Sequence, residues 1–303
     1  MELELNLEIC RAVLESVPIG VYLTDRKRQI VFWNTRAERI TGYLGQEVVG
    51  HYCPDNLLMH CDENQVSLCS GECPLARTMQ DGRIGEATIF LRHKEGQRVP
   101  VRVQAVPLRD ESGAIVGAAE FFEEQSFRAT GMRCPHLREK VSLDDITEVP
   151  DRGTTESAIA AALETFAASA AAFGVITIAI DNLDHLRRVY GCQASNAILY
   201  AAAQTLSAGT RPEDLVGRWN EDRFVALVAC PGTEGLRSCA ERLRRLIGVA
   251  SVPWWGDRLS FTVSMGGTMV RPADTVQSLL ARGAEALAAG QAARGESITM
   301  VLG

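Results

Sequence analysis

The sequence predicts an α+β protein of two domains. Its 303 residues, of which 46% are hydrophobic, are enough to fill two separate cores. The N-terminal part carries strand-like segments separated by short turns, whereas the C-terminal part alternates helical segments with buried strand-like runs. Between them, residues 126–141 mix glycine and proline into a charged segment. Because such residues interrupt a continuous helix, this segment is predicted to be a linker.

Composition excludes several functions. The chain has 31 basic and 38 acidic residues and a net charge of -7, which would repel a phosphate backbone, so we expect no nucleic-acid partner. The N-terminal segment MELELNLEICRAVLE is acidic and periodic, unlike a secretory leader. The longest uncharged run, Thr165 to Ile180, is shorter than the ~20 apolar residues of a membrane-spanning helix. We therefore expect a cytoplasmic protein without membrane association.

The N-terminal domain, expected at residues 1–125, opens with short strands. IGVYLTD and QIVFWN are strand-like, the turn between them runs from Asp25 to Arg28, and RAERITGY predicts a short helix. Further on, EATIFLRHKEGQRVPVRVQAVPLRDESGAIVGAAEFFEE contains three alternating segments separated by KEG and DESG turns. This pattern is typical of an antiparallel meander.

Nearly the whole of this domain resembles the PAS family of sensor domains. The resemblance rests on the HKEG turn, on the closing segment DESGAIVGAAEFFEE, and on Gly20, Asp25, Asn34, Gly42 and Gly50. It implies a five-stranded antiparallel sheet with helices over one face. Many relatives leave this domain through an unbroken helix that pairs in a dimer. We expect a homodimer here too, although the linker's glycine and proline argue against a simple coiled-coil relay.

A cysteine-rich insertion at about residues 51–75 interrupts the PAS-like pattern. It contains Cys53, Cys61, Cys69 and Cys73, with His51 and His60 in the same window. Thiolates are soft ligands, so the cluster predicts a metal site for zinc or an iron-sulfur cluster, with the two histidines as alternate ligands. The domain is therefore expected to sense metal or redox state.

The same cysteines have a second interpretation. Their spacing, C-x7-C-x7-C-x3-C, differs from the paired C-x2-C of ordinary zinc modules, and the leucines among them indicate a core face. Buried structural cysteines are the alternative. The sulfur-flavin adduct motif of photosensing relatives is absent, and neither flavin nor haem is indicated.

The C-terminal domain, expected at residues 142–303, alternates helices and strands. TTESAIAAALETFAASAAA is helical, VITIAI is a buried strand, and DHLRRVYG to LYAAAQTLSAG is again helical. LVGRW and RFVALVAC follow as a strand pair, LRSCAERLRRLIG as a helix, LSFTVSMGGTMV as one strand and VQSLLARGAEALAAGQAA as a last helix. The order predicts a mixed β/α domain with an antiparallel hairpin at its centre.

The turn sequence RWNEDRF, from Arg218 to Phe224, resembles the signature of the GGDEF family, which joins two GTP molecules into cyclic di-GMP. DDITEVPDR resembles the opening segment of that family and FTVSMG its late strand, so the resemblance covers this whole half. It implies a palm-like mixed sheet with flanking helices.

The resemblance also implies that catalytic groups are missing. When Tyr190-Gly191 sets the register, the family's metal-binding Asp falls on Ala179. Further positions that the family uses to bind GTP carry Arg187, Asn196, Asn220, Glu221, Arg223, Gln291 and Gly295. Because the metal ligand, both signature glycines and the basic residues that bind phosphate are replaced, we expect a degenerate domain without catalysis. Asp181 and Asp222 remain as vestigial carboxylates, and a PAS-regulated weak diguanylate cyclase is the alternative.

One family site is retained. Arg211 and Asp214 form an Arg-x-x-Asp motif at the spacing of the inhibitory product site, and Arg242 falls where the family places a second arginine. In that site the arginine fork binds guanine or phosphate and the Asp accepts from the guanine edge. The resemblance thus implies a receptor for cyclic di-GMP. A protein effector as the partner, or a dimerisation platform that binds no nucleotide, remain open.

Overall fold

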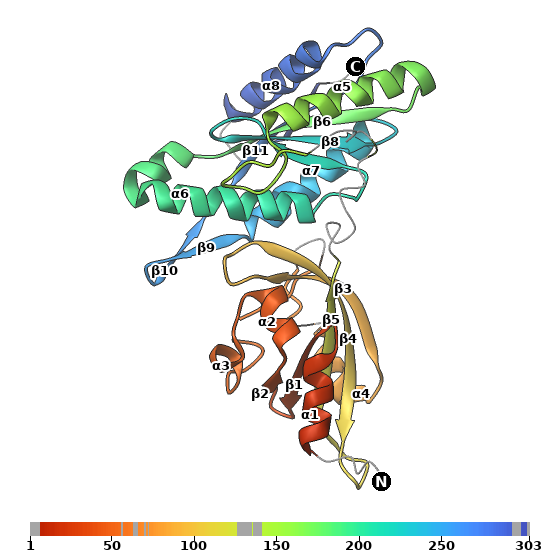
Figure 1. Ribbon diagram of the computed structural model, residues 1–303, viewed down its shortest axis with the longest axis vertical. Helices are drawn as coiled ribbons and strands as arrows, with labels where there is room; N and C mark the ends of the chain where they lie inside the picture. The colour runs from red at the N-terminus through yellow and green to blue at the C-terminus, as the bar shows by residue number, and fades with distance from the viewer. Residues whose placement is uncertain are drawn as a thin grey trace. The chain divides into compact units, whose positions relative to one another are not determined.

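The computed structural model describes residues 7–55, 57–62, 66–69, 71, 73–125, 135, 141–292 and 298–301. The chain divides into two compact units, residues 1–94 with 99–126, and residues 95–98 with 127–303. Most of the expected linker, 126–134 and 136–140, lies outside the described residues, as does Gly295. Each unit has its own sheet (Figure 1).

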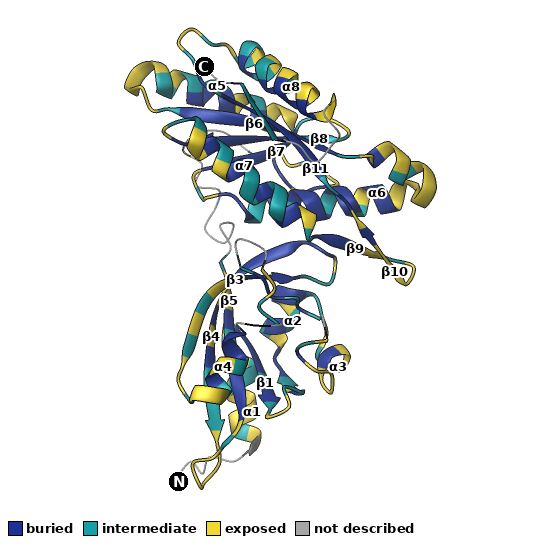
Figure 2. Cartoon of the chain, turned by 180° about the vertical axis from the view of Figure 1, so that it is seen from behind, coloured by how far each residue is buried: buried dark blue, intermediate teal, exposed yellow. Residues whose placement is uncertain are grey.

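The first unit contains a five-stranded antiparallel sheet in the order β2-β1-β5-β4-β3, as the PAS resemblance implies. Its elements are α1 (Leu7–Ser16), β1 (Gly20–Asp25), β2 (Ile30–Trp33), α2 (Thr35–Thr41), α3 (Gly45–Val48), α4 (Pro74–Asp81), β3 (Gly85–Arg92), β4 (Arg98–Arg109) and β5 (Ile115–Glu124). Residues of α2, α3 and α4 share one core with the sheet, so these helices cover one of its faces (Figure 2).

Two polar residues of the PAS-like pattern explain how this unit begins. Asp25 Oδ1 accepts hydrogen bonds from the backbone N–H groups of Lys27 and Gln29, both at 2.8 Å, and so closes the β1–β2 turn. Asn34 Oδ1 accepts from Val21 N at 2.9 Å and caps α2 through Ala37 N at 2.8 Å. The bonds of Asp25 and the Asn34–Ala37 cap span only a few residues, so a local sequence pattern can predict them, whereas the bond from Val21 to Asn34 is longer in range.

The second unit contains a five-stranded mixed sheet in the order β12-β11-β6-β8-β7, beside a β9–β10 hairpin. Its elements are α5 (Arg152–Ser169), β6 (Phe173–Ile180), α6 (Leu183–Ala208), β7 (Leu215–Arg218), β8 (Arg223–Ala229), α7 (Thr233–Gly248), β9 (Ser251–Trp254), β10 (Asp257–Ser260), β11 (Val263–Met269), α8 (Val276–Ala292) and β12 (Ile298–Val301). Helices α6 and α7 pack on one face and α5 and α8 on the other (Figure 1). With both faces covered, every residue of the central strand β6 is buried.

One expected strand of this unit is divided. LSFTVSMGGTMV was predicted as a single strand, but its first residues end β10, which pairs with β9, and the later ones form β11, which pairs with β6. The apolar pattern continues through both strands, so it carries no sign of the change of partner. β10 forms a hairpin with the neighbouring β9, whereas β11 pairs with β6, which lies far away in the sequence.

In the described part of the chain, the helices are too short or too polar to cross a membrane.

Candidate functional site

The signature turn keeps the family's hairpin without its glycines. The Arg218 guanidinium is buried over the ring of Phe224, 5.1 Å from its centre. Its Nε donates to the carbonyl oxygen of Asn220 at 2.5 Å and its Nη2 donates to that of Glu221. Arg218 thus holds the turn between β7 and β8 through charge-assisted hydrogen bonds to two of its carbonyl oxygens, while its guanidinium packs on the Phe224 ring.

Two of the substituted side chains meet at this turn. Arg187, at the position where the family recognises guanine, lies with Nη1 3.6 Å from Oε2 of Glu221, which replaces the second glycine. Arg223, which replaces the second acid, has Nε 3.8 Å from Oδ1 of Asp222. These are surface ion pairs of small energetic weight. Their importance is that side chains stand where the family keeps bare backbone.

The vestigial carboxylates have different partners. Asp181 accepts from the hydroxyl of Thr262 at 2.8 Å and from that of Ser264 at 2.7 Å, so both of its oxygens are engaged. Asp222 instead faces Arg223. Ala179, at the family's metal-ligand position, is fully buried in β6 opposite Arg223. The arrangement offers no carboxylate at that position.

The retained Arg-x-x-Asp motif lies in the loop between α6 and β7. Asp214 is 7% exposed, and its carboxylate accepts from Arg211 N and from Ala229 N, both at 3.0 Å. Burial raises the pKa of Asp214, although these backbone hydrogen bonds oppose the shift. Asp214 therefore has a structural role that the sequence pattern did not reveal. The Arg211 side chain is exposed.

Arg242, on α7, belongs to the same corner of the domain. Its Nη2 lies 3.9 Å from the sulfur of Cys239, and its Nε is buried without a hydrogen-bond partner among the described residues. Burial raises the pKa of Cys239 to about 11, while the charges of Arg242 and Asp214 act on the same thiol. The charges of Arg242 and Asp214 both reach the Cys239 thiol, so the two residues lie in the same part of the domain, and their assignment to a ligand site stays a prediction.

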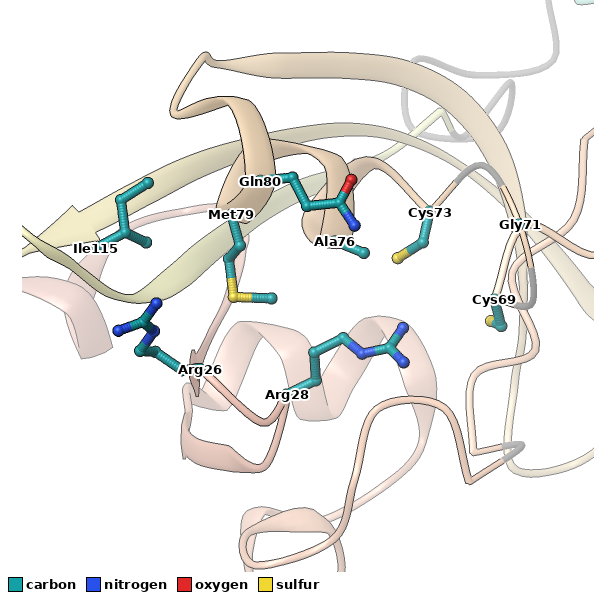
Figure 3. Close-up of a pocket in the computed structure, with 9 residues that line it drawn as sticks. All are labelled: Arg26, Arg28, Cys69, Gly71, Cys73, Ala76, Met79, Gln80 and Ile115. Atoms are coloured by element: carbon teal, nitrogen blue, oxygen red, sulfur yellow. The ribbon is translucent and has the colours of Figure 1, made fainter.

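In the first unit, the cysteine-rich insertion contributes to the core. Cys53, Cys61 and Cys73 are buried and Cys69 is half-buried. The sulfur of Cys53 lies 3.6 Å from the Tyr22 hydroxyl, and burial holds the pKa of Cys53 well above its usual value. Cys69 and Cys73 line a pocket of about 420 Å³ together with Arg28, into which Cys73 and Arg28 point from opposite sides (Figure 3).

A buried acid next to this cluster escaped the sequence interpretation. Glu120 of β5 is 1% exposed, and its Oε1 lies 4.0 Å from Nε2 of the buried His60. Burial raises the pKa of Glu120 to about 7. One sequence signal points to it: Glu120 is a single acid between Ala119 and Phe121 on a strand whose inner positions are apolar.

Within the described residues, no three His, Cys, Asp or Glu side chains already surround a common point as metal ligands would. The predicted metal set of Cys53, Cys61, Cys69 and Cys73, with His51 and His60 as alternates, therefore stays a prediction.

Comparisons with known proteins identify the two domains. The family model described as "PAS domain" matches residues 18–126, and that described as "Diguanylate cyclase, GGDEF domain" matches residues 141–297. Diguanylate cyclase DgcP of Pseudomonas aeruginosa is 27% identical over 191 residues, which cover 61% of this chain and 28% of that protein. The probable diguanylate cyclase DgcE of Escherichia coli is 21% identical over 257 residues, which cover 85% of this chain and 23% of that protein. The chain spans about a quarter of the length of these relatives.

Solved structures share the fold of the second unit. The GGDEF domain of DgcB from Caulobacter crescentus, in complex with c-di-GMP, superimposes with a TM-score of 0.51 at 16% identity over 54% of this chain and 94% of that one. Diguanylate cyclase SiaD of Pseudomonas aeruginosa, in complex with its activator SiaC, superimposes with a TM-score of 0.52 at 20% identity, over 52% of this chain and 61% of that one. The chain therefore belongs to the GGDEF, or diguanylate cyclase, domain family and carries a PAS domain before its GGDEF domain.

Proposed function

We propose that this protein is a signalling receptor whose PAS domain is coupled to a catalytically silent GGDEF domain that binds cyclic di-GMP. The observation that carries the proposal is the contact between Arg187 and Glu221 at 3.6 Å. Arg187 stands at the position with which the family recognises guanine, and Glu221 stands where the family has a glycine, so two large side chains meet where the nucleotide would bind. The loss of the metal-ligand carboxylate at the buried Ala179 supports the same conclusion.

The corner formed by Arg211, Asp214 and Arg242 supports binding without turnover. Arg211 offers an exposed guanidinium, and the half-buried Arg242 supplies a second positive charge in the same part of the domain, so the two arginines suit an anionic ligand. Asp214 fixes the turn that presents Arg211. A receptor that makes no second messenger must act through a protein effector, and a homodimer is the simplest form in which the PAS signal reaches it.

Arg211→Ala should abolish cyclic di-GMP binding in isothermal titration, because charge-assisted contacts to the ligand are lost. Arg244→Ala is the matched control: Arg244 lies two positions from Arg242 on α7, hence toward another side of the helix, and this variant should bind normally. Equal affinity of the Arg211→Ala variant and the unmodified protein would remove this site from the proposal. Steady formation of cyclic di-GMP from GTP and magnesium would instead establish the weak-cyclase alternative.

A further inference from the structure

A chain of contacts connects part of the cysteine-rich insertion to the sheet of the PAS unit. Cys53 lies 3.6 Å from the Tyr22 hydroxyl, and Tyr22 stands directly opposite Glu120 in the β1–β5 pairing. Glu120 in turn lies 4.0 Å from His60. Cys69 and Cys73 line the neighbouring pocket, and their charges act on the Cys53 thiol. Three thiols and one imidazole therefore lie around a single buried carboxylate.

That carboxylate has little compensation for its burial. Neither oxygen of Glu120 makes a hydrogen bond within ordinary limits among the described residues, and the Tyr22 side chain offsets only part of the effect of burial on its pKa. A buried charge of this kind is costly unless it has a compensating group. A carboxylate beside a buried imidazole is the usual support of a metal-binding histidine, which it orients through one ring nitrogen. Nε2 of His60 faces Glu120, as this kind of support requires.

The other predicted ligands have different surroundings. The sulfur of Cys61 lies 3.8 Å from the carbonyl oxygen of Phe90, and Cys61 pairs with Phe90 and Ser67 through isolated β-bridges. His51 is exposed and follows the short helix α3. Cys61 follows His60 in the chain, but its sulfur faces the Phe90 carbonyl group, and the His51 side chain is exposed. The contacts through Tyr22, Glu120 and the pocket instead connect the other four candidates.

The pocket supplies access and charge. The pocket has a volume of about 420 Å³, and Cys69 and Cys73 are among the residues that line it (Figure 3). Arg28 reaches it from the β1–β2 turn with a left-handed backbone, φ 65°, which is unfavourable for arginine. The Arg28 charge opposes the effect of burial on the pKa of both thiols. Three thiolates, one imidazole and a divalent cation carry one net negative charge, and both arginines that line the pocket, Arg26 and Arg28, supply positive charge beside it.

We propose that Cys53, Cys69, Cys73 and His60 are the ligands of a thiophilic metal centre, zinc or an iron-sulfur cluster, with Glu120 orienting His60. Binding draws the sulfur atoms of Cys69 and Cys73 from the pocket wall toward Cys53, because the four groups do not yet surround one point. The metal would fasten the insertion to the core, so its gain or loss is a means by which the PAS unit senses its surroundings.

The test measures metal per chain in the full-length protein, purified without oxygen and also reconstituted with zinc or with ferrous iron and sulfide. Unmodified protein should hold one centre per chain, and Cys69→Ser, Cys73→Ser and His60→Ala should lose it. Cys61→Ser and His51→Ala are the matched controls and should retain it. A visible absorption spectrum distinguishes the iron-sulfur cluster from colourless zinc, and either centre with this ligand pattern supports the proposal.

Glu120→Gln tests the positioning role. Chelator competition should show metal affinity weakened about 10- to 100-fold, whereas a purely structural acid would leave that affinity unchanged. Circular dichroism and thermal unfolding of every metal-free variant check that it folds. The proposal is overturned if the unmodified protein binds no metal under either reconstitution, or if Cys61→Ser loses as much metal as Cys69→Ser. Cyclic di-GMP titration reports on the other unit, so failure here leaves the receptor proposal to its own test.

Discussion

Single carboxylates in this protein often stabilise backbone conformation. Asp25, Asp214 and Asp274 each accept from main-chain N–H groups near a turn. Asp214 shows the consequence for function: the residue that the family resemblance assigns to ligand binding also closes its own loop. A substitution there would test folding and binding at once, which is why Arg211 is the better probe.

Asp274 also forms an ion pair with Arg282, and the contribution of this pair to stability can be measured. Its carboxylate makes two contacts of 2.6 Å to the Arg282 guanidinium, which lower its pKa to about 2. A carboxyl group whose pKa is lower in the folded state than in the unfolded state stabilises the fold at pH values above its unfolded-state pKa. This stabilisation is lost as the pH falls toward 2. Asp274→Asn should therefore cost about 2 kcal/mol at pH 7.

Urea unfolding at pH 7, 5 and 3 measures this difference, which should narrow between pH 5 and pH 3. Asp257→Asn, at an exposed position of β10, is the control and should change stability by less than about 0.5 kcal/mol. An Asp274→Asn defect that stays constant down to pH 3 would contradict the ion-pair explanation.

Among elements, the contact between α8 and β11 depends on glycine. A Cβ at Gly266 of β11 would collide with the backbone of α8 at Gly283 and Leu287. The helix therefore lies directly on the strand, and the sequence GG in FTVSMGG marks that approach.

Gly266→Ala should destabilise the GGDEF unit by about 1–3 kcal/mol, because the helix must move away from the strand. Denaturant unfolding measures the loss. Gly248→Ala offers a comparison, since a Cβ there meets no atom within 4 Å, and it should be neutral or slightly stabilising. Equal stability of the two variants would show that α8 has room to adjust.

At the scale of the whole molecule, the question is whether the signature turn alone silences the domain. The triple variant Asn220→Gly/Glu221→Gly/Arg223→Glu restores the turn but leaves Ala179 in the central strand, where no carboxylate can hold a metal. It should form no cyclic di-GMP from GTP and magnesium. Product from this variant would show that Ala179 does not stand at the metal-ligand position, and the quadruple variant with Ala179→Asp is the comparison.

The architecture was predictable because its signals are local. Asp25 and Asn34 bond to backbone within a few residues or to the adjoining strand, and the strand-turn patterns of both units carry their own periodicity. The division of β10 from β11 was missed because one apolar run changes partner: β10 pairs with the neighbouring β9 across the turn at Gly256, whereas β11 pairs with β6, which lies far away in the sequence. The same reason hid Glu120, whose neighbours His60 and Tyr22 come from other parts of the chain.

The sequence by itself determined that a PAS domain precedes a GGDEF domain, and which family positions carry altered residues. Only the tertiary structure decided what those residues do: that Arg187 meets Glu221, that Asp214 accepts from Ala229 N on β8, and that Cys53 lies next to Tyr22 while Cys61 lies against Phe90. The sequence specifies the chemistry of each side chain. Strand pairing and burial decide which distant side chains come into contact, and a local sequence pattern does not predict those contacts.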